Sequence, residues 1–259
     1  MIWIDYALIG LLAGFLAGYL GIGGGLVLVP ALSWLFSQDP SISEIAVHMA
    51  VATSLATMLV TSLSSIFAHH RRRAIMWPIA TGLAPGLIAG AIAGAMLATR
   101  LSTDHLAAVF GSYAALAGMQ LISGREVESQ KAMPGRLGSG ITGLAIGTVS
   151  SLVGIGGGSM TVPWLLWHGR RAQQAVATAA VCGFPIALAG TLTFIVLGQQ
   201  HVAAGSHGGY VHLQAFAGVV LFSVVSAPLG AAAVHRSPPA LVRRIFGAFM
   251  LLVAWRMFF

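Results

Sequence analysis

The chain has 259 residues, of which 57% are hydrophobic and only 7% carry a charge. A soluble domain has roughly 25% charged residues, so this composition excludes an ordinary soluble protein and indicates an integral membrane protein. The apolar stretches are as long as helices, far from the ~10-residue alternating strands of an outer-membrane barrel. We therefore predict an all-α, polytopic membrane protein.

The net charge of +7 would suggest nucleic-acid binding in a soluble protein. Here the basic residues stand in short connections between apolar segments, where they orient the chain in the membrane. We therefore expect the lipid bilayer as a partner and no nucleic acid. The single cysteine, Cys182, excludes an intramolecular disulfide.

Eight apolar segments follow one another along the chain. They cover residues 5–36, 43–68, 76–99, 104–123, 138–168, 172–198, 211–235 and 239–258. The longest polar connection, residues 124–136, divides them into two sets of four. We predict repeat 1 at residues 1–123, a cytoplasmic connector at 124–136 and repeat 2 at 137–259, which together form one membrane domain.

The two halves resemble each other in sequence, which indicates an internal duplication. The sequence Gly-Ile-Gly-Gly-Gly occurs at residues 21–25 and again at 154–158, and a proline follows each copy at the same distance. The sequence Ala-Val-Ala-Thr of residues 50–53 returns at 175–178. Because the order of the matches is kept, duplication explains them better than chance.

The positions of the basic residues favour one arrangement of the segments. If all eight segments crossed the membrane, seven Lys and Arg residues would face one side and six the other. If segments 5–36 and 138–168 are re-entrant hairpins, the count becomes eleven against two, which is the bias expected of an inner-membrane protein. We therefore favour two inverted repeats, each a hairpin plus three crossings, and keep eight full crossings as the alternative.

Four glycines within five residues predict a break in the first segment of each repeat. Glycine costs about 1 kcal/mol relative to alanine inside a helix, and unwound backbone at bilayer depth is tolerated only inside protein or beside a cavity. The helix that leaves such a break offers free N–H groups and a positive dipole end, which suit an anion. Proline prefers the first turn of a helix, so we expect Pro30 and Pro163 to mark where the outgoing helices begin.

We expect the two breaks to meet at mid-membrane and to hold a small oxyanion without a buried Lys or Arg. The alternative is that the glycines only allow tight helix packing. Hydroxyls near the breaks are further candidates, although most hydroxyls in membrane helices bond their own backbone. The candidate substrate-binding residues are Gly21, Gly23, Gly24, Gly25, Thr53, Ser54, Gly156, Gly157, Gly158, Ser159, Thr161 and Thr178.

Other kinds of chemistry have less support. All six acidic residues stand at segment ends or in the connector, so no buried carboxylate is available for a proton relay, and we expect a uniporter or weak coupling. The histidines His201, His207 and His212 could bind zinc or copper, so a metal-cation transporter is the alternative function, although we expect no resident metal. No catalytic motif of the metalloprotease or hydrolase type occurs, and we expect neither an enzyme nor a cofactor.

At the duplicated glycine motif the sequence resembles a known family. Residues 14–30, Gly-Phe-Leu-Ala-Gly-Tyr-Leu-Gly-Ile-Gly-Gly-Gly-Leu-Val-Leu-Val-Pro, resemble the hallmark of the sulfite exporter TauE/SafE family, and residues 147–163 look like its second hallmark. The resemblance covers essentially the whole chain. It implies a transporter of the bacterial inner membrane for sulfur-containing anions such as sulfite, sulfoacetate and other organosulfonates.

The resemblance also implies that the glycines of both motifs lie close to the substrate. In the second copy Ser159 and Thr161 replace Leu26 and Leu28 of the first, so the site is expected to be asymmetric. We therefore predict a multi-pass transporter that binds a small sulfur-containing anion between the two breaks and works by alternating access. Whether it forms a homo-oligomer is left open.

Overall fold

The computed structural model describes residues 2–20, 24–123, 132–199, 207–234 and 239–258. Helices dominate these residues, because the long apolar segments satisfy their backbone polar groups internally only as helices. The helices are α1 (Ile2–Leu20), α2 (Gly25–Ser37), η1 (Ser43–Ile45), α3 (Ala46–Arg71), α4 (Trp77–Ala98), α5 (Thr103–Ser123), α6 (Arg136–Val153), α7 (Gly158–Trp167), α8 (Ala172–Gly198), α9 (Leu213–Val234) and α10 (Pro239–Phe258). A two-residue antiparallel pair, β1 (His207–Gly208) and β2 (Val211–His212), precedes α9.

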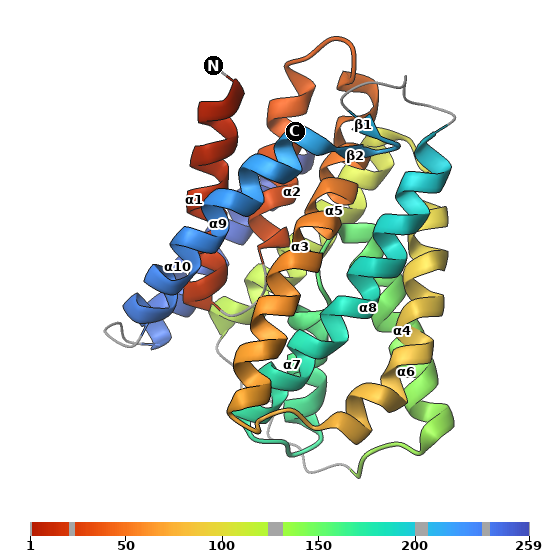
Figure 1. Cartoon of the computed structure of the whole chain (residues 1–259), viewed down its shortest axis with the longest axis vertical. Coiled ribbons are helices and arrows are strands. Elements are labelled where there is room, and N and C mark those ends of the chain that lie inside the picture. The colour runs from red at the N-terminus through yellow and green to blue at the C-terminus, as the bar shows by residue number, and fades with distance from the viewer. Residues whose placement is uncertain (1, 21–23, 124–131, 200–206, 235–238, 259) are drawn as a thin grey trace.

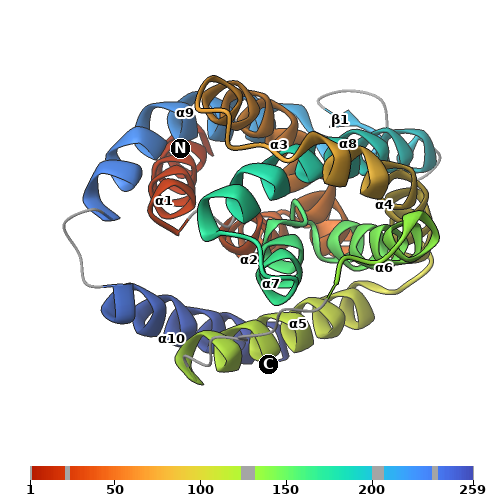
Figure 2. The same cartoon turned by 90° about the horizontal axis from the view of Figure 1, so that it is seen from below.

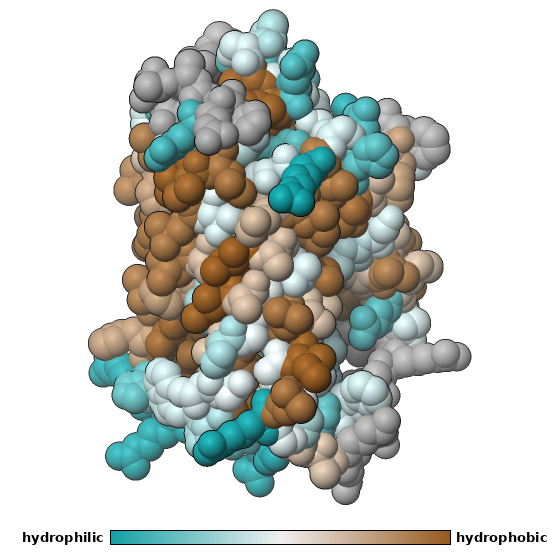
Figure 3. Space-filling view, turned by 90° about the vertical axis from the view of Figure 1, so that its right-hand side faces the viewer, coloured by the Kyte–Doolittle hydropathy of each residue, from teal (hydrophilic) through white to brown (hydrophobic). Residues whose placement is uncertain are grey.

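Several helices are long and apolar enough to cross a membrane. Within the described residues these are Ser43–Arg71, Trp77–Ala98, Thr103–Ser123 and Ala172–Gly198, and shorter apolar helices accompany them. Figure 3 shows hydrophobic residues over much of the middle of one face, with hydrophilic residues gathered toward its two ends. The prediction of an all-α, polytopic membrane protein is confirmed.

The first predicted segment of each half is broken at its glycine motif. Segment 5–36 forms α1 and α2, and segment 138–168 forms α6 and α7. Figure 1 shows α1 descending from the upper end of the molecule and α2 returning toward that end, while α6 and α7 do the same from the lower end. Each pair is therefore a re-entrant hairpin, and the alternative of eight uninterrupted crossings does not describe the chain.

The two prolines do not stand where the sequence suggested. Pro30 lies inside α2, which begins five residues earlier at Gly25, and Pro163 lies inside α7, which begins at Gly158. The expectation that they mark the helix starts was wrong, because glycine occupies the first turn in both helices. Since proline has no N–H, each removes a helical hydrogen bond within the outgoing helix.

The first helix of each hairpin packs against a helix of the other half. On α4, a Cβ added at Gly90 would meet the carbonyl oxygen of Leu144 and lie 2.8 Å from the amide nitrogen of Thr148, both on α6. On α1, a Cβ added at Gly14 would lie 2.5 Å from the Cα of Ser223 on α9. Only glycine allows backbones to approach this closely, as is common between membrane helices.

The remaining helices form two further pairs that join the halves. Helices α3 and α8 cross the middle of the molecule, where a Cβ at Gly190 would lie 2.9 Å from the Leu55 side chain. Helices α5 and α10 lie side by side along one flank (Figure 2), with Gly118 packed against the Gly247 carbonyl. Every pair joins one half to the other, so neither half buries its apolar faces alone. The inverted relation of the two halves stays a prediction.

Substituting a glycine on α4 tests this packing. Gly90→Ala should lower the stability by about 1–3 kcal/mol, because the added methyl group has no space against α6. Gly82→Ala on the same helix is the matched control, since a Cβ there meets nothing within 4 Å. The control should be neutral or stabilising by up to about 1 kcal/mol. Thermal unfolding of both variants in one detergent provides the measurement, and equal midpoints would contradict the packing.

Candidate functional site

The two glycine motifs meet inside the molecule. Gly25, the first residue of α2, packs against the carbonyl oxygen of Gly154, and a Cβ added to it would lie 3.1 Å from the Cα of Ile155. The hydroxyl of Ser54 lies 3.2 Å from the same Cβ position and donates to the Gly154 carbonyl at 2.9 Å. A residue with a side chain has no space at position 25, so the motif allows one hairpin to contact the backbone of the other.

The second break has a backbone that requires glycine. Gly154 ends α6 with a φ of 72°, and Gly157 precedes α7 with a φ of 66°. These left-handed conformations are accessible to glycine at little cost. The amide of Ile155 donates to the Ser150 carbonyl, and the amide of Gly157 donates to the Ile155 carbonyl. The break is therefore a defined turn.

The start of α7 presents amide groups that lack a partner. The amides of Met160 and Thr161 donate to the Gly157 carbonyl. The amides of Gly158 and Ser159 donate to no acceptor within the described part of the chain. Free amides at a helix start, together with the helix dipole, attract an anion.

At the first break the structure describes only the last two residues of the glycine motif, Gly24 and Gly25. Gly24 caps α2, and its carbonyl accepts from the amides of Val27 and Leu28. Gly21 and Gly23, which the sequence also proposed as substrate-binding, lie outside the described residues. Their role stays a prediction.

Buried hydroxyls without a partner occur on the helices that flank the second break. Within the described residues, the side-chain oxygens of Ser150, Ser151, Thr161 and Thr191 are buried and make no hydrogen bond. The Ser150 oxygen lies 3.6 Å from the Cβ position of Gly157. A buried polar group without a partner costs about 1–3 kcal/mol, so a group of them calls for an explanation. A ligand that accepts hydrogen bonds would provide one.

Sequence reasoning found Thr161 but missed Ser150 and Ser151. A signal was present, because the 133-residue offset between the motifs aligns these two serines with Ala17 and Gly18. Around the second motif the hydroxyls stand on both sides of the glycines, whereas the first motif has none at the matching positions. A position-by-position comparison of the two copies therefore identifies the second break as the more polar one.

Ser159 has a partner that the sequence did not reveal. The hydroxyl of Tyr113, on α5, donates to the Ser159 oxygen at 2.6 Å. Because Ser159 accepts this bond, its own proton remains available for another acceptor. Tyr113 follows the Phe-Gly pair of residues 110–111, which returns at residues 246–247, but this repeat does not reveal the contact with Ser159, which only the fold shows.

The duplicated threonines hold helix ends of the opposite half. The Thr53 oxygen accepts a hydrogen bond from the amide of His212, just before α9, at 3.0 Å. The Thr178 oxygen accepts one from the amide of Met76, just before α4, at 3.1 Å. Both threonines are fully buried. The duplication of Ala-Val-Ala-Thr is explained by this matching structural role, and a direct role in substrate binding stays a prediction.

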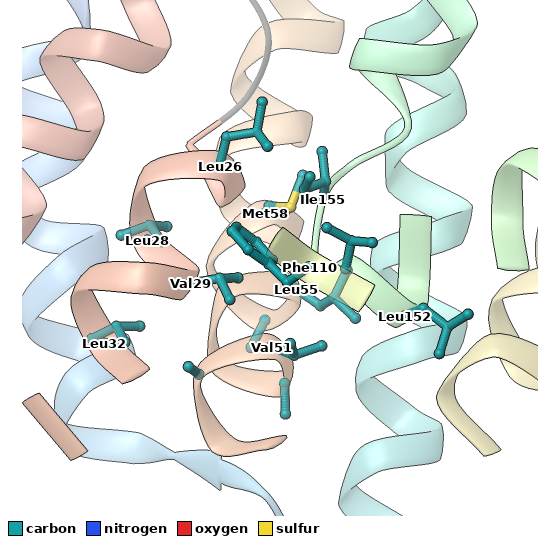
Figure 4. Packing of buried hydrophobic residues seen from close by; sticks show 14 of the residues in the cluster. Leu26, Leu28, Val29, Leu32, Val51, Leu55, Met58, Phe110, Leu152 and Ile155 are labelled. Atoms are coloured by element: carbon teal, nitrogen blue, oxygen red, sulfur yellow. The ribbon is translucent and has the colours of Figure 1, made fainter. Parts of the chain in front are cut away.

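Apolar side chains cover the breaks in this conformation. The end of the Met58 side chain occupies the space beside Gly156, and Ile186 lies 2.6 Å from the Cβ position of Gly157. Figure 4 shows Met58, Ile155 and Phe110 gathered at this level between the helices. Two hollows of about 260 and 270 Å³ lie along α8, and neither is lined by a residue of the glycine motifs. In this conformation these side chains fill the space beside Gly156 and Gly157, whereas Gly158 and Ser159 are half-buried.

The arginines that the structure describes stand at the surface of the molecule. Every arginine whose side chain the structure describes is exposed, namely Arg71, Arg72, Arg73, Arg100, Arg136, Arg170, Arg171, Arg244 and Arg256. The described donors at the second break are all neutral. An anion site without a buried cation stays a prediction.

The histidines proposed for a metal do not form a described cluster. His201 lies outside the described residues, and His207 belongs to β1. His212 is buried, its ring stacks on Phe36 at 5.1 Å, and its Nδ1 accepts from the Ala215 amide at 3.2 Å. This side chain thus caps α9. Among the described residues, no group of three His, Cys, Asp or Glu side chains could hold a metal ion.

Comparisons with known proteins agree on one family. A model of the sulfite exporter TauE/SafE family matches residues 6–257. A probable membrane transporter protein of Haemophilus influenzae is 34% identical over 97% of this chain and 96% of its own length. Probable membrane transporter proteins of Bacillus subtilis and Methanocaldococcus jannaschii are 24% and 26% identical, covering 77% and 86% of this chain and 80% of each relative. No solved structure gives a significant match.

The threonine bonds between the halves can be tested by isosteric substitution. Thr53→Val should lower the stability by about 1–3 kcal/mol, because it leaves the buried His212 amide without an acceptor. Thr53→Ser should restore most of the loss. Thr57→Val is the control, since the Thr57 hydroxyl donates only to the Ser54 carbonyl of its own helix. Thermal unfolding is the readout, and a Thr53→Val protein as stable as the control would exclude this role.

Proposed function

This chain belongs to the sulfite exporter TauE/SafE family, and we propose that it carries small sulfur-containing oxyanions across the bacterial inner membrane. Sulfite, sulfoacetate and other organosulfonates are the substrates that the family name and the site chemistry suggest. The chain is a multi-pass membrane transporter, and its curated relatives are named as probable transporters. No enzyme activity is part of the proposal.

The observation that carries the proposal is the set of neutral donors at the second break. The amides of Gly158 and Ser159 and the hydroxyls of Ser150 and Thr161 have no acceptor among the described residues. Hydrogen bonds to a charged acceptor are roughly twice as strong as those between neutral groups. A small oxyanion would therefore accept hydrogen bonds from several of these unpaired donors at once.

The hairpins suggest how access alternates. They enter from opposite ends of the molecule and touch where Gly25 meets Gly154. An anion between them lies close to the middle of the bilayer, and each end of the protein is closed by a different hairpin. Movement that withdraws Met58 and Phe110 from the break would open one route, and the opposite movement would open the other. We propose Gly24, Gly25, Gly156, Gly157 and Gly158 as the backbone that the substrate passes.

We further propose that residues 1–123 and 137–259 are inverted repeats. The pairing of helices supports this, because α1 of the first half lies along α9 of the second, and α6 of the second lies along α4 of the first. The hydrogen bonds of Thr53 and Thr178 likewise join a helix of one half to the start of a helix in the other half. The basic connections at residues 69–73, 124–136, 169–171 and 236–244 would then face the cytoplasm.

Removing the unpaired hydroxyls tests the anion site. Ser150→Ala and Thr161→Val should each weaken the binding of a sulfonate by about 10- to 150-fold, which corresponds to about 1.5–3 kcal/mol for a bond to a charged group. The ligand-free proteins should be as stable as the parent or more stable, because the lost hydroxyls had no partner. Thr148→Val is the control, since that hydroxyl donates to the Leu144 carbonyl of its own helix.

Thermal stabilisation by methanesulfonate, sulfoacetate and sulfite measures this binding, since the shift follows RT ln(1 + [L]/Kd). Flux into proteoliposomes with the same anions measures transport. If the Ser150→Ala and Thr161→Val variants bind and transport the anions as the parent does, the anion site lies elsewhere than at this break. Stabilisation of the parent by Zn²⁺ and by none of the anions would favour a metal-cation transporter.

The orientation can be tested by labelling with a membrane-impermeant maleimide. In a Cys182→Ala background, Asp39→Cys should react in intact cells, because the 38–42 connection lies at the end opposite the basic connections. Arg170→Cys should react only after the membrane is opened. The two residues are exposed, so both sites are reachable by the reagent. Reaction of both variants, or of neither, in intact cells would contradict the opposed hairpins.

A further inference from the structure

We infer that the second break selects an oxyanion group that carries a single negative charge, so that the sulfonate group of an organosulfonate and hydrogen sulfite bind there and the divalent groups of sulfate and sulfite do not. The inference rests on the proposed function, because it concerns the charge state of the anion held there. It follows from the kind of donors at the break and from what surrounds them.

The donors are several, and none carries a charge. Two are the amides of Gly158 and Ser159, which have no acceptor within the described residues. Two are the buried hydroxyls of Ser150 and Thr161. The fifth is the Ser159 hydroxyl, whose proton is free because its oxygen already accepts from Tyr113. Ser159 and Thr161 stand two residues apart and so lie on different faces of α7, and a sulfonate group at the helix start would bind the two amides together with the donors of one face.

Within the described residues, no cationic side chain stands near the middle of the helices around the break. Helices α2, α3, α5, α6 and α8 pack around the break, and the charged and titratable side chains described on them stand near their ends. His69, His70 and Arg71 close α3, Asp104 and His105 open α5, and Arg136 opens α6. His48 stands near the start of α3, where its Nε2 donates to the carbonyls of Ala98 and Leu101.

Two titratable groups remain near the middle of these helices. They are Tyr113, which donates to Ser159, and the buried thiol of Cys182, which precedes Gly183 at the Gly156 carbonyl. Neither is a cation in any protonation state. The favourable field at the site therefore comes from hydrogen-bond dipoles and from the start of α7, equivalent to about half an elementary charge.

Two energies decide which charge state of the anion binds better, namely the cost of removing the anion from water and its attraction to the neutral donors. The cost of removing an ion from water rises with the square of its charge, and it is already of order 20 kcal/mol for a singly charged ion in an idealised interior. A divalent anion costs about four times as much on the same Born basis. Attraction to neutral dipoles rises only in proportion to the charge, so it about doubles. A site without a cation therefore favours the monovalent anion.

The test compares anions that differ in charge and share the tetrahedral sulfur. Thermal stabilisation of the purified full-length protein is measured with methanesulfonate, sulfate and sulfite at about pH 6 and about pH 8, with each shift taken relative to protein in buffer alone. Methanesulfonate is monovalent at both pH values, and sulfate is divalent at both. Sulfite changes from mainly monovalent to mainly divalent over this range.

We expect equal methanesulfonate affinity at the two pH values and no shift with sulfate. The apparent affinity for sulfite should fall by about tenfold between the lower and the higher pH, because the bound form loses its proton in solution. Ser150→Ala should weaken methanesulfonate and sulfite binding together, and Thr148→Val should weaken neither.

The failures of the two proposals can be told apart. Sulfate binding as tight as methanesulfonate, or sulfite binding that strengthens as the pH rises, would overturn selection by charge and leave an anion transporter. Absence of stabilisation by all three anions in the parent would count against the proposed function itself, and with it this inference.

Discussion

The contact between Gly25 and the backbone of residues 154–155 is the constraint on which the rest of the structure depends. The start of α2 in one half touches the unwound stretch after α6 in the other half, inside an apolar interior where each unpaired backbone group is costly. Glycine permits the approach, and the Ser54 hydroxyl satisfies the Gly154 carbonyl that the break exposes. The hairpins can end inside the protein only because each one supplies the other with a polar or backbone surface.

The surrounding helices hold this contact by joining the two halves at every level. The glycines of α4 allow that helix to pack closely against α6, and those of α1 allow α1 to pack closely against α9. Thr53 and Thr178 accept hydrogen bonds from the backbone amides just before α9 and α4. Such links make the hairpins part of one rigid set of helices. The flanking pair α5 and α10 reaches the break through α5, where the Tyr113 hydroxyl donates to Ser159.

Sequence patterns predicted the helices, the two breaks and their meeting, because apolar length and the repeated glycines are local signals. They were less informative about what each polar atom does. Thr53 and Thr178 stood out as a repeated pair, yet their partners are backbone amides more than a hundred residues away. Pro30 and Pro163 were placed at helix starts by their usual preference, whereas glycine took the first turn. Ser150 and Tyr113 depend on tertiary packing, which no single segment encodes.

The length of α7 has an electrical consequence. Its ten residues span about 15 Å at 1.5 Å per residue, roughly half of the ~30 Å hydrocarbon core. A monovalent anion seated at its first turn has therefore crossed about half of the membrane potential. At 100 mV the full crossing is worth about 2.3 kcal/mol, so each half-step is worth about 1.2 kcal/mol. If the chain carries a monovalent anion as proposed, an inside-negative voltage would favour its outward movement in two nearly equal steps.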